Sequence, residues 1–241
     1  MKSIMNRDHP AQPVKLPIAL TILVIFQGLL GMWTVTMSLF PPVVMSHLLG
    51  GFTTFSLLLL LSLRLSQALP PIKDAAVAKL FPFTLLAIVL LTLQIALGGW
   101  TAANYAAVIC TELPICQGNW SQHLNFVEAF QLWGHNEVDY EFAPHIGPDA
   151  KITIHITHRI GAIVVSLYLF WLIFKLFTTS QLERYKNFAW LLLATLVVQI
   201  ALGISNVVMN LPLMVAVAHN AVAAILLLEL VAINYCVFKS R

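Results

Sequence analysis

The stretch HITHRIGA, which runs from His155 to Ala162, opens an apolar segment long enough to cross a membrane. It places His155 and His158 three residues apart, with Arg159 directly after the second histidine. Side chains at positions i and i+3 share one face of a helix. Ionisable groups are costly in hydrocarbon, so they usually face the interior of a bundle and have a function there. The stretch therefore predicts a membrane helix with a functional face, around which we expect the other helices to pack.

The composition predicts a membrane protein with several spans. Of the 241 residues, 59% are hydrophobic and only 10% are charged, and the mean hydropathy is +0.86. A soluble domain carries about 25% charged residues. Six apolar runs reach membrane-spanning length, at about 16–38, 44–66, 80–103, 152–176, 188–208 and 213–237. We therefore expect an all-α polytopic fold with six transmembrane helices, embedded in lipid and without a nucleic-acid partner.

Positive charges alternate along the chain in a way that predicts its orientation. One group precedes the first span, a second and a third lie in the second and fourth connections, and a fourth follows the last span. These residues are Lys2, Arg7, Lys15, Arg64, Lys73, Lys79, Lys175, Arg184, Lys186, Lys239 and Arg241. Only Lys151 and Arg159 fall on the other side if the spans alternate. The positive-inside rule then places both termini in the cytoplasm.

The long connection over residues 101–151 is expected outside. Its mixture of aromatic and acidic residues favours a folded cap on the membrane surface, with a solvated linker as the alternative. Cys110 and Cys116 occur in CTELPIC, within this loop. Because the outer compartment is oxidising, we expect a disulfide there, with two free thiols as the alternative. Cys236, near the end of the last span, is expected to be a free packing residue.

The chain contains an internal repeat. FQGLLGMWTVTMSLFPPVVMSH at 26–47 matches VQIALGISNVVMNLPLMVAVAH at 198–219, and in both a glutamine precedes a histidine by twenty residues. The pattern Gln-x-x-Leu-Gly also occurs in the third span, so Gln27, Gln94 and Gln199 are expected to hydrogen-bond between helices. Pro41, Pro42 and Pro212 are expected in the turns, because proline cannot continue a helix.

The repeat predicts one four-helix bundle plus two helices of a second, incomplete bundle. Spans three to six form the four-helix unit, and spans one and two match its last two helices. By this reasoning, two further helices should precede span one. The two copies run in parallel, which argues against a transporter built on inverted repeats.

Four histidines are expected to enter the membrane from the same outer face: His47, His155, His158 and His219. Imidazoles from facing helices at one depth are suited to haem iron, and two of them leave no open coordination position. Arg159 is expected to act as counter-charge to a haem propionate near the surface.

Each of these residues also has a structural alternative. His47 or His219 alone could make a polar contact between helices. His155 could lie at the helix entrance beside the headgroups, and Arg159 could snorkel to the interface. The joint pattern of matched histidines with an adjacent arginine favours a bound haem over these separate explanations.

Other polar residues give weaker signals. His123, His135 and His145 lie in the outer loop at wide spacing, so surface histidines are the better interpretation than a zinc site. Glu229 lies inside the last span, where either a proton-path role or pairing with a neighbouring helix would explain it.

Three stretches together resemble the haem A synthase family of bacteria and mitochondria: HITHRIGA, LGGWTAANYAAVICTELPICQGNW and FQGLLGMWTVTMSLFPPVVMSHLLGGFTT. The resemblance extends from about Val14 onward. It implies eight membrane helices in two homologous four-helix halves. The second half of such a protein holds a b-type haem between two histidines. The first half binds haem O and oxidises its C8 methyl group to the formyl group of haem A, with oxygen from water.

By the same resemblance, His158 and His219 are the ligands of haem b, and His47 is a histidine of the substrate half that contacts the substrate haem iron. Cys110 and Cys116 match the family's cysteine pair in the outer loop. The family's first half has an E-x-x-H-R motif, whereas this chain has none, and His155 stands where that motif has its glutamate. The catalytic residues therefore stay unassigned.

The resemblance gives each region an expected role. Residues 1–15 form a cytoplasmic segment, 16–66 two helices of an incomplete substrate half, and 80–237 the haem b half. The implied protein is an oxidoreductase of the bacterial inner membrane that takes haem O to haem A, with haem O synthase and cytochrome oxidase assembly proteins as partners. Two alternatives follow from the missing motif: a non-catalytic haem b-binding, electron-transfer or assembly subunit, and one part of a split enzyme completed by a separately encoded two-helix piece.

Overall fold

The computed structural model describes residues 13–66, 68–133, 146–179 and 181–241. Within these residues every regular element is helical, and six helices are long and apolar enough to cross a membrane. This confirms the predicted all-α polytopic membrane fold. The six are α2 (Lys15–Thr36), α3 (Pro41–Ser66), α5 (Phe81–Ala103), α7 (Pro148–Thr179), α8 (Glu183–Val208) and α9 (Leu213–Lys239). The short elements are α4 (Ala75–Ala78), η1 (Trp120–Gln122) and α6 (Phe126–Ala129).

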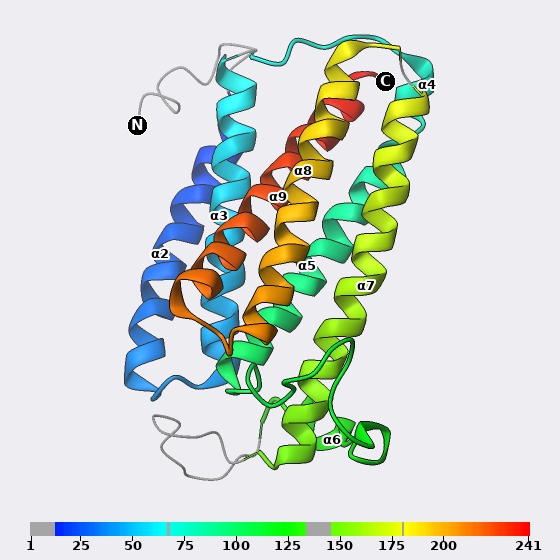
Figure 1. The fold of residues 1–241 in the computed structure, drawn as a ribbon. Helices are drawn as coiled ribbons and strands as arrows, with labels where there is room; N and C mark the ends of the chain where they lie inside the picture. The colour runs from blue at the N-terminus through cyan, green and yellow to red at the C-terminus, as the bar shows by residue number, and fades with distance from the viewer. Residues whose placement is uncertain (1–12, 67, 134–145, 180) are drawn as a thin grey trace.

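The last four long helices form a closed ring, in which α5 packs on α7, α7 on α8, α8 on α9 and α9 back on α5 (Figure 1). The ring encloses an apolar core, and Leu169, Leu172, Leu192 and Leu230 are completely buried in it. Helix α3 packs against α5 and α9 outside this ring, and α2 packs against α3. The chain is therefore a four-helix bundle with a helical hairpin on one side.

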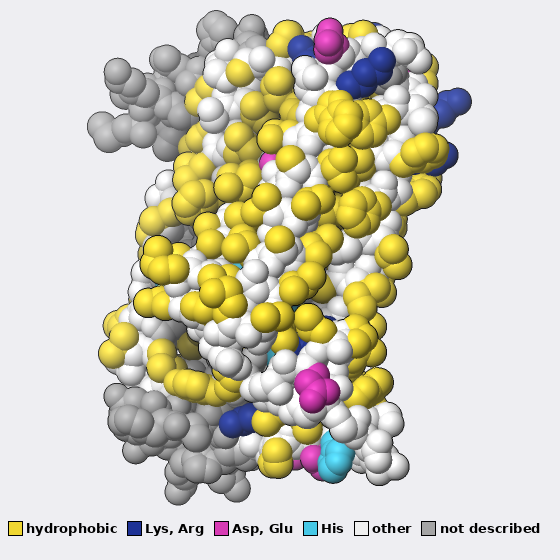
Figure 2. Space-filling model, in the orientation of Figure 1, with side chains coloured by type: hydrophobic (Ala, Val, Ile, Leu, Met, Phe, Trp, Pro, Cys, Tyr) yellow, Lys and Arg dark blue, Asp and Glu magenta, His cyan; other side chains and the backbone are white. Residues whose placement is uncertain are grey.

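The helices alternate in direction, so the α2–α3 turn, the α8–α9 turn and the long α5–α7 connection lie at one end of the bundle (Figure 1). We call this the loop end. Hydrophobic side chains cover the middle of the face shown in Figure 2, and most charged side chains lie toward its two ends. Many large apolar side chains on the long helices are exposed, among them Ile22, Val35, Leu167 and Trp190. Lipid is the environment in which such a surface is stable.

The two short turns share one backbone conformation. Ser38 and Leu39 have φ of 48° and 60°, and the equivalent Asn210 and Leu211 have φ of 55° and 59°. Tyr105, which follows α5, also has a positive φ of 50°. Left-handed residues after a helix let their N–H groups bond to carbonyls of its last turn. The repeat seen in the sequence therefore extends to the way in which α2, α5 and α8 end.

Pro41 and Pro42 lie in the first turn of α3 rather than in the preceding turn, so the expectation for them was wrong. The first turn of a helix tolerates proline because its N–H groups have no partner within the helix. Pro148 likewise begins α7 four residues before the expected start. Pro212 does lie outside a helix, as the N-cap of α9.

The described part of the α5–α7 connection is folded against the loop end. Trp100 is buried and donates from Nε1 to the carbonyl of Ala129 at 2.8 Å. A small apolar cluster that includes Ile146 and Ile154 surrounds it. Residues 134–145, with His135 and His145, lie outside the described residues. The folded portion places a cap over the end of the bundle where the histidines lie.

Candidate functional site

Each of three helical pairs combines a helix carrying Gln-x-x-x-Gly with a helix carrying a histidine. The pairs are α2 with α3, α5 with α7, and α8 with α9. Their glutamines, glycines and histidines are Gln27, Gly31 and His47; Gln94, Gly98 and His158; and Gln199, Gly203 and His219. The glutamine and the glycine are four residues apart, so they share a helix face. In all three pairs that face meets the histidine.

The three glycines leave room for the imidazole rings. A Cβ added at Gly98 would lie 3.1 Å from Cε1 of His158. The corresponding distance is 3.2 Å from Gly203 to His219 and 3.4 Å from Gly31 to His47. Contacts of 3.1–3.2 Å are too close for an undisturbed ring, so any side chain larger than hydrogen at Gly98 or Gly203 would displace the imidazole. The glycines therefore form notches in which the rings lie.

The three glutamines bond to the histidines, as expected for contacts between helices. Gln27 donates from Nε2 to the carbonyl of His47 at 2.9 Å. Gln94 donates to the carbonyl of His158 at 2.9 Å and also lies 3.0 Å from its Nδ1. Gln199 lies with Nε2 3.3 Å from Nε2 of His219. The sequence indicated that these glutamines cross between helices, but not that each of them meets a histidine.

The histidines predicted to form one constellation lie at the loop end, within the first three turns of α3, α7 and α9. His158 lies close enough to His155, His219 and Arg159 for electrostatic interaction. His155 is buried within α7 rather than at the helix entrance. His47 belongs to the neighbouring hairpin, where its ring lies on Gly31.

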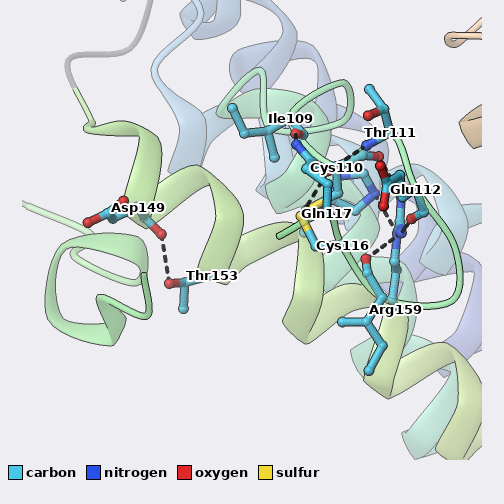
Figure 3. The surroundings of a disulfide bond; sticks show 11 residues. Ile109, Cys110, Thr111, Glu112, Cys116, Gln117, Asp149, Thr153 and Arg159 are labelled. Atoms are coloured by element: carbon cyan, nitrogen blue, oxygen red, sulfur yellow. Dashed lines mark hydrogen bonds between the residues drawn. A yellow bond between two sulfur atoms is a disulfide. The ribbon is translucent and has the colours of Figure 1, made fainter. Parts of the chain in front are cut away.

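Arg159 connects α7 to the disulfide loop, which lies in front of it (Figure 3). The structure contains the predicted bond between Cys110 and Cys116. Arg159 donates to the carbonyls of Cys110 and Glu112, each at 2.6 Å, and to that of Ile115. Its Nε lies 3.1 Å from Nε2 of His155. A buried guanidinium needs such partners because its five N–H donors lose water on burial.

The role expected for Arg159 as counter-charge to a propionate stays a prediction. Its guanidinium holds three backbone oxygens of the loop, and none of the partners found within the described residues is a carboxylate. Sequence reasoning missed this contact, because nothing in the pattern around HITHRIGA points to a loop more than forty residues away.

Of the outer-loop histidines, the structure describes His123. His123 is exposed and pairs with Asp149, at 3.1 Å between Nδ1 and Oδ1. No group of three or more potential ligands from His, Cys, Asp and Glu that could hold a metal ion occurs in the described part of the chain. Cys236 is a buried free thiol, as expected.

Glu229 is buried in α9 and pairs with a neighbouring helix. Its Oε1 accepts a hydrogen bond of 2.7 Å from the hydroxyl of Thr195 in α8. Its Oε2 is buried without a partner within the described residues. Of the two interpretations of this residue, the contact supports helix pairing directly.

Comparison with known proteins identifies the family. Residues 2–231 match the family model described as cytochrome oxidase assembly protein. The chain is 51% identical over 226 residues to a haem A synthase of Shewanella oneidensis, covering 94% of this chain and 67% of that protein. The chain belongs to the haem A synthase family. Within that family it is also 29% identical to a haem A synthase of Methylobacterium nodulans and 27% identical to one of Flavobacterium psychrophilum.

These two haem A synthases match 80% and 84% of the chain, which spans 50% and 58% of their lengths. The residues that could hold a cofactor are the histidines of the loop end. Two imidazoles from α7 and α9, each lying in a glycine notch, form a donor set that suits an iron porphyrin. Within the residues that the structure describes, Nδ1 of His219 is buried and makes no side-chain hydrogen bond, which a ligand held at this end of the bundle would explain.

Proposed function

We propose that the chain acts in haem A biosynthesis as a haem A synthase-like membrane protein, with haem b as cofactor, haem O as substrate and haem A as product. The observation that carries the proposal is that His158 and His219 interact electrostatically across the ring of helices, and that each imidazole lies against a glycine. It is supported by the family to which the chain belongs. A bis-histidine haem has no open position, so it supplies electron transfer rather than substrate binding.

In this proposal each residue at the loop end has its own task. His158 and His219 ligate the haem iron from α7 and α9. Arg159 holds the disulfide loop over these rings through three carbonyls, which keeps water from the outer end of the bundle. His47, seated on Gly31 in the adjoining hairpin, faces the substrate haem.

Oxidation of the C8 methyl group of haem O to a formyl group takes its oxygen from water and releases four electrons and four protons, so the electrons would pass singly through haem b to an external oxidant. The electrons are proposed to pass from a substrate at the α2–α3 hairpin, which carries His47, to haem b in the ring of α5, α7, α8 and α9. Helix α3 packs directly against α5 and α9, so the hairpin and the ring share an interface. A close approach at Gly99, where a Cβ would lie 2.7 Å from Leu48, brings α5 and α3 together.

A second candidate function is a haem b-binding electron-transfer or assembly subunit, or one part of a split haem A synthase. It is favoured by the sequence, in which no E-x-x-H-R motif occurs. His155 belongs to the haem b half, where its imidazole contacts Arg159 at 3.1 Å, and it does not supply the carboxylate of the substrate half. In both functions the protein lies in the bacterial inner membrane with its termini in the cytoplasm, near cytochrome oxidase assembly proteins and haem O synthase.

The test is a haem extraction and a reduced-minus-oxidised spectrum of the purified chain, expressed with haem O available. We expect close to one haem b per chain. His158→Ala removes an axial ligand and should lose the six-coordinate haem, whereas His123→Ala, at an exposed histidine, should retain it. A parent chain without haem, or an unchanged six-coordinate spectrum in His158→Ala, would contradict the proposal. Conversion of haem O to haem A would separate the synthase from the electron-transfer subunit.

A further inference from the structure

Gln94 differs from the other two glutamines in the number of bonds that it makes to its histidine. Its terminal NH2 group lies 2.9 Å from the carbonyl of His158 and 3.0 Å from Nδ1 of the same residue. An NH2 group carries two hydrogens, so both bonds can form together. Gln27 makes only the carbonyl bond, to His47. Gln94 thus fixes both the backbone and the ring orientation of His158.

The contact at Nδ1 determines which nitrogen of His158 can meet a ligand. A neutral imidazole has one protonated nitrogen and one free nitrogen. When Nε2 binds a metal, Nδ1 carries the hydrogen and needs an acceptor, and such partners orient the ring and tune the metal. With Nδ1 held by α5, Nε2 is the nitrogen left for a ligand.

The surroundings of Gln94 allow its amide to bond to Nδ1 of His158 whether or not that nitrogen carries the hydrogen. Its Oε1 is buried and has no partner within the described residues. It lies directly over Gly161, where an added Cβ would collide with it. Because Gly161 has no side chain, the amide has room to turn and present Oε1 instead of Nε2 to the ring. The bond to the carbonyl of His158 is then exchanged for a bond to Nδ1. An oxygen in that position would accept a hydrogen from Nδ1.

Gln199 faces a helix that has no glycine three residues after its histidine. Gly50 and Gly161 each follow their histidine by three residues, and a Cβ at either would collide with the facing glutamine. Val222 occupies the corresponding position after His219. There the amide of Gln199 lies at the ring, 3.3 Å from Nε2, rather than at the carbonyl. The two glutamines that bond to a histidine carbonyl are therefore those that face a glycine three residues after the histidine.

We propose that Gln94 is a positioning residue for the haem iron, which orients His158 through Nδ1 and, by turning its amide over Gly161, accepts the Nδ1 hydrogen when Nε2 is bound to iron. This inference rests on the proposed function, in which His158 is an axial ligand. It assigns unequal roles to the two ligands, because the amide of the glutamine that faces His219 lies at Nε2 rather than at Nδ1.

The test compares Gln94→Glu, Gln94→Leu and the matched control Gln27→Leu in the full chain. The readouts are haem b content, the midpoint potential from a spectroscopic redox titration, and the low-spin electron paramagnetic resonance signal. A carboxylate accepts the Nδ1 hydrogen more strongly than an amide does and makes the ring a better donor. We therefore expect Gln94→Glu to retain haem with a lowered potential. Gln94→Leu should raise the potential and weaken haem binding about tenfold or more.

Gln27→Leu removes an equivalent bond to a carbonyl and should leave the potential and the resonance signal unchanged. Equal midpoint potentials in the parent and both Gln94 variants would overturn this inference but not the proposed function. A shift in Gln27→Leu as large as that in Gln94→Leu would do the same. A parent chain that binds no haem would overturn the proposed function and, with it, this inference. Gln94→Glu keeps the size and shape of the side chain, so the comparison does not depend on the fold of Gln94→Leu.

Discussion

Gly98 controls the position of one ring, and its role can be separated from general helix stability. In Gly98→Ala the new Cβ would lie 3.1 Å from Cε1 of His158, so the ring must move. Overpacking of this kind costs about 1–3 kcal/mol. Alanine in a helix is also about 1 kcal/mol more stable than glycine. We therefore expect roughly tenfold weaker retention of haem, measured by haem transfer to an excess of apo-globin. Thermal unfolding should show a net loss of stability of no more than about 2 kcal/mol.

Gly28→Ala is the matched control, because no heavy atom lies within 4 Å of a Cβ added at Gly28 on α2. It should retain haem like the parent chain and gain slightly in helix stability. Equal haem loss from both variants would mean that the notch at Gly98 does not position the ring.

Thr195 is expected to stabilise the bundle through Glu229. Its hydroxyl is the partner found for a buried carboxyl group, at 2.7 Å, and loss of that bond leaves the acceptor unsatisfied. Thr195→Val should therefore lower the free energy of unfolding by about 0.6–2 kcal/mol, the range typical of hydrogen bonds between membrane helices. The measurement is unfolding in mixed detergent micelles.

Thr92→Val serves as the comparison for Thr195→Val. The hydroxyl of Thr92 bonds only to the carbonyl of Ile88 within its own helix, so no partner on another helix is lost. If the two variants were equally stable, the contact between Thr195 and Glu229 would contribute nothing to the packing of α8 on α9.

At the scale of elements, Arg159 is expected to hold the disulfide loop in place. A lysine has one ammonium group and cannot reach three carbonyls in the planar arrangement of a guanidinium. In Arg159→Lys the loss of charged hydrogen bonds should lower the opening free energy of the loop by about 2 kcal/mol. Exchange of the Thr111 amide, which bonds to Gln117 at 3.0 Å, should become roughly thirtyfold faster. Hydrogen exchange with mass spectrometry measures this change.

Arg64→Lys, at an exposed arginine near the end of α3, should leave loop exchange unchanged. A loop that stays equally protected in Arg159→Lys would show that the disulfide and the packing around Trp100 suffice to order it.

The elements themselves were largely predictable, and their contacts only in part. Six apolar runs give six helices because membrane spans must satisfy their own backbone hydrogen bonds. The repeated Gln-x-x-Leu-Gly pattern correctly indicated bonds between helices. It could not give their targets, because hydropathy carries no information on how each helix is rotated. The bonds of Gln94 to His158 and of Arg159 to the loop join residues 64 and 44–49 positions apart, and no local pattern encodes them.

At the scale of the whole molecule, the distribution of charge predicts which end of the bundle faces the cytoplasm. The α3–α5 connection, with Lys73 and Lys79, and the first turn of α8, with Arg184, lie at the end opposite the disulfide loop (Figure 1). Positive residues favour the cytoplasmic side, and a disulfide is stable in an oxidising compartment. Both arguments predict that the loop end, with its histidines, faces the outer side of the membrane.

Two variants of the chain, each with one cysteine added to the three native ones, test this orientation. Ser121 is exposed in η1 at the loop end, and Ser66 is exposed at the opposite end of α3. In intact spheroplasts a membrane-impermeant maleimide should label Ser121→Cys at once. It should label Ser66→Cys only after the membrane is opened. Cys236 is buried and Cys110 is paired with Cys116, so the parent chain gives the background. The reverse labelling pattern would place the haem site at the cytoplasmic face, where the disulfide would not persist.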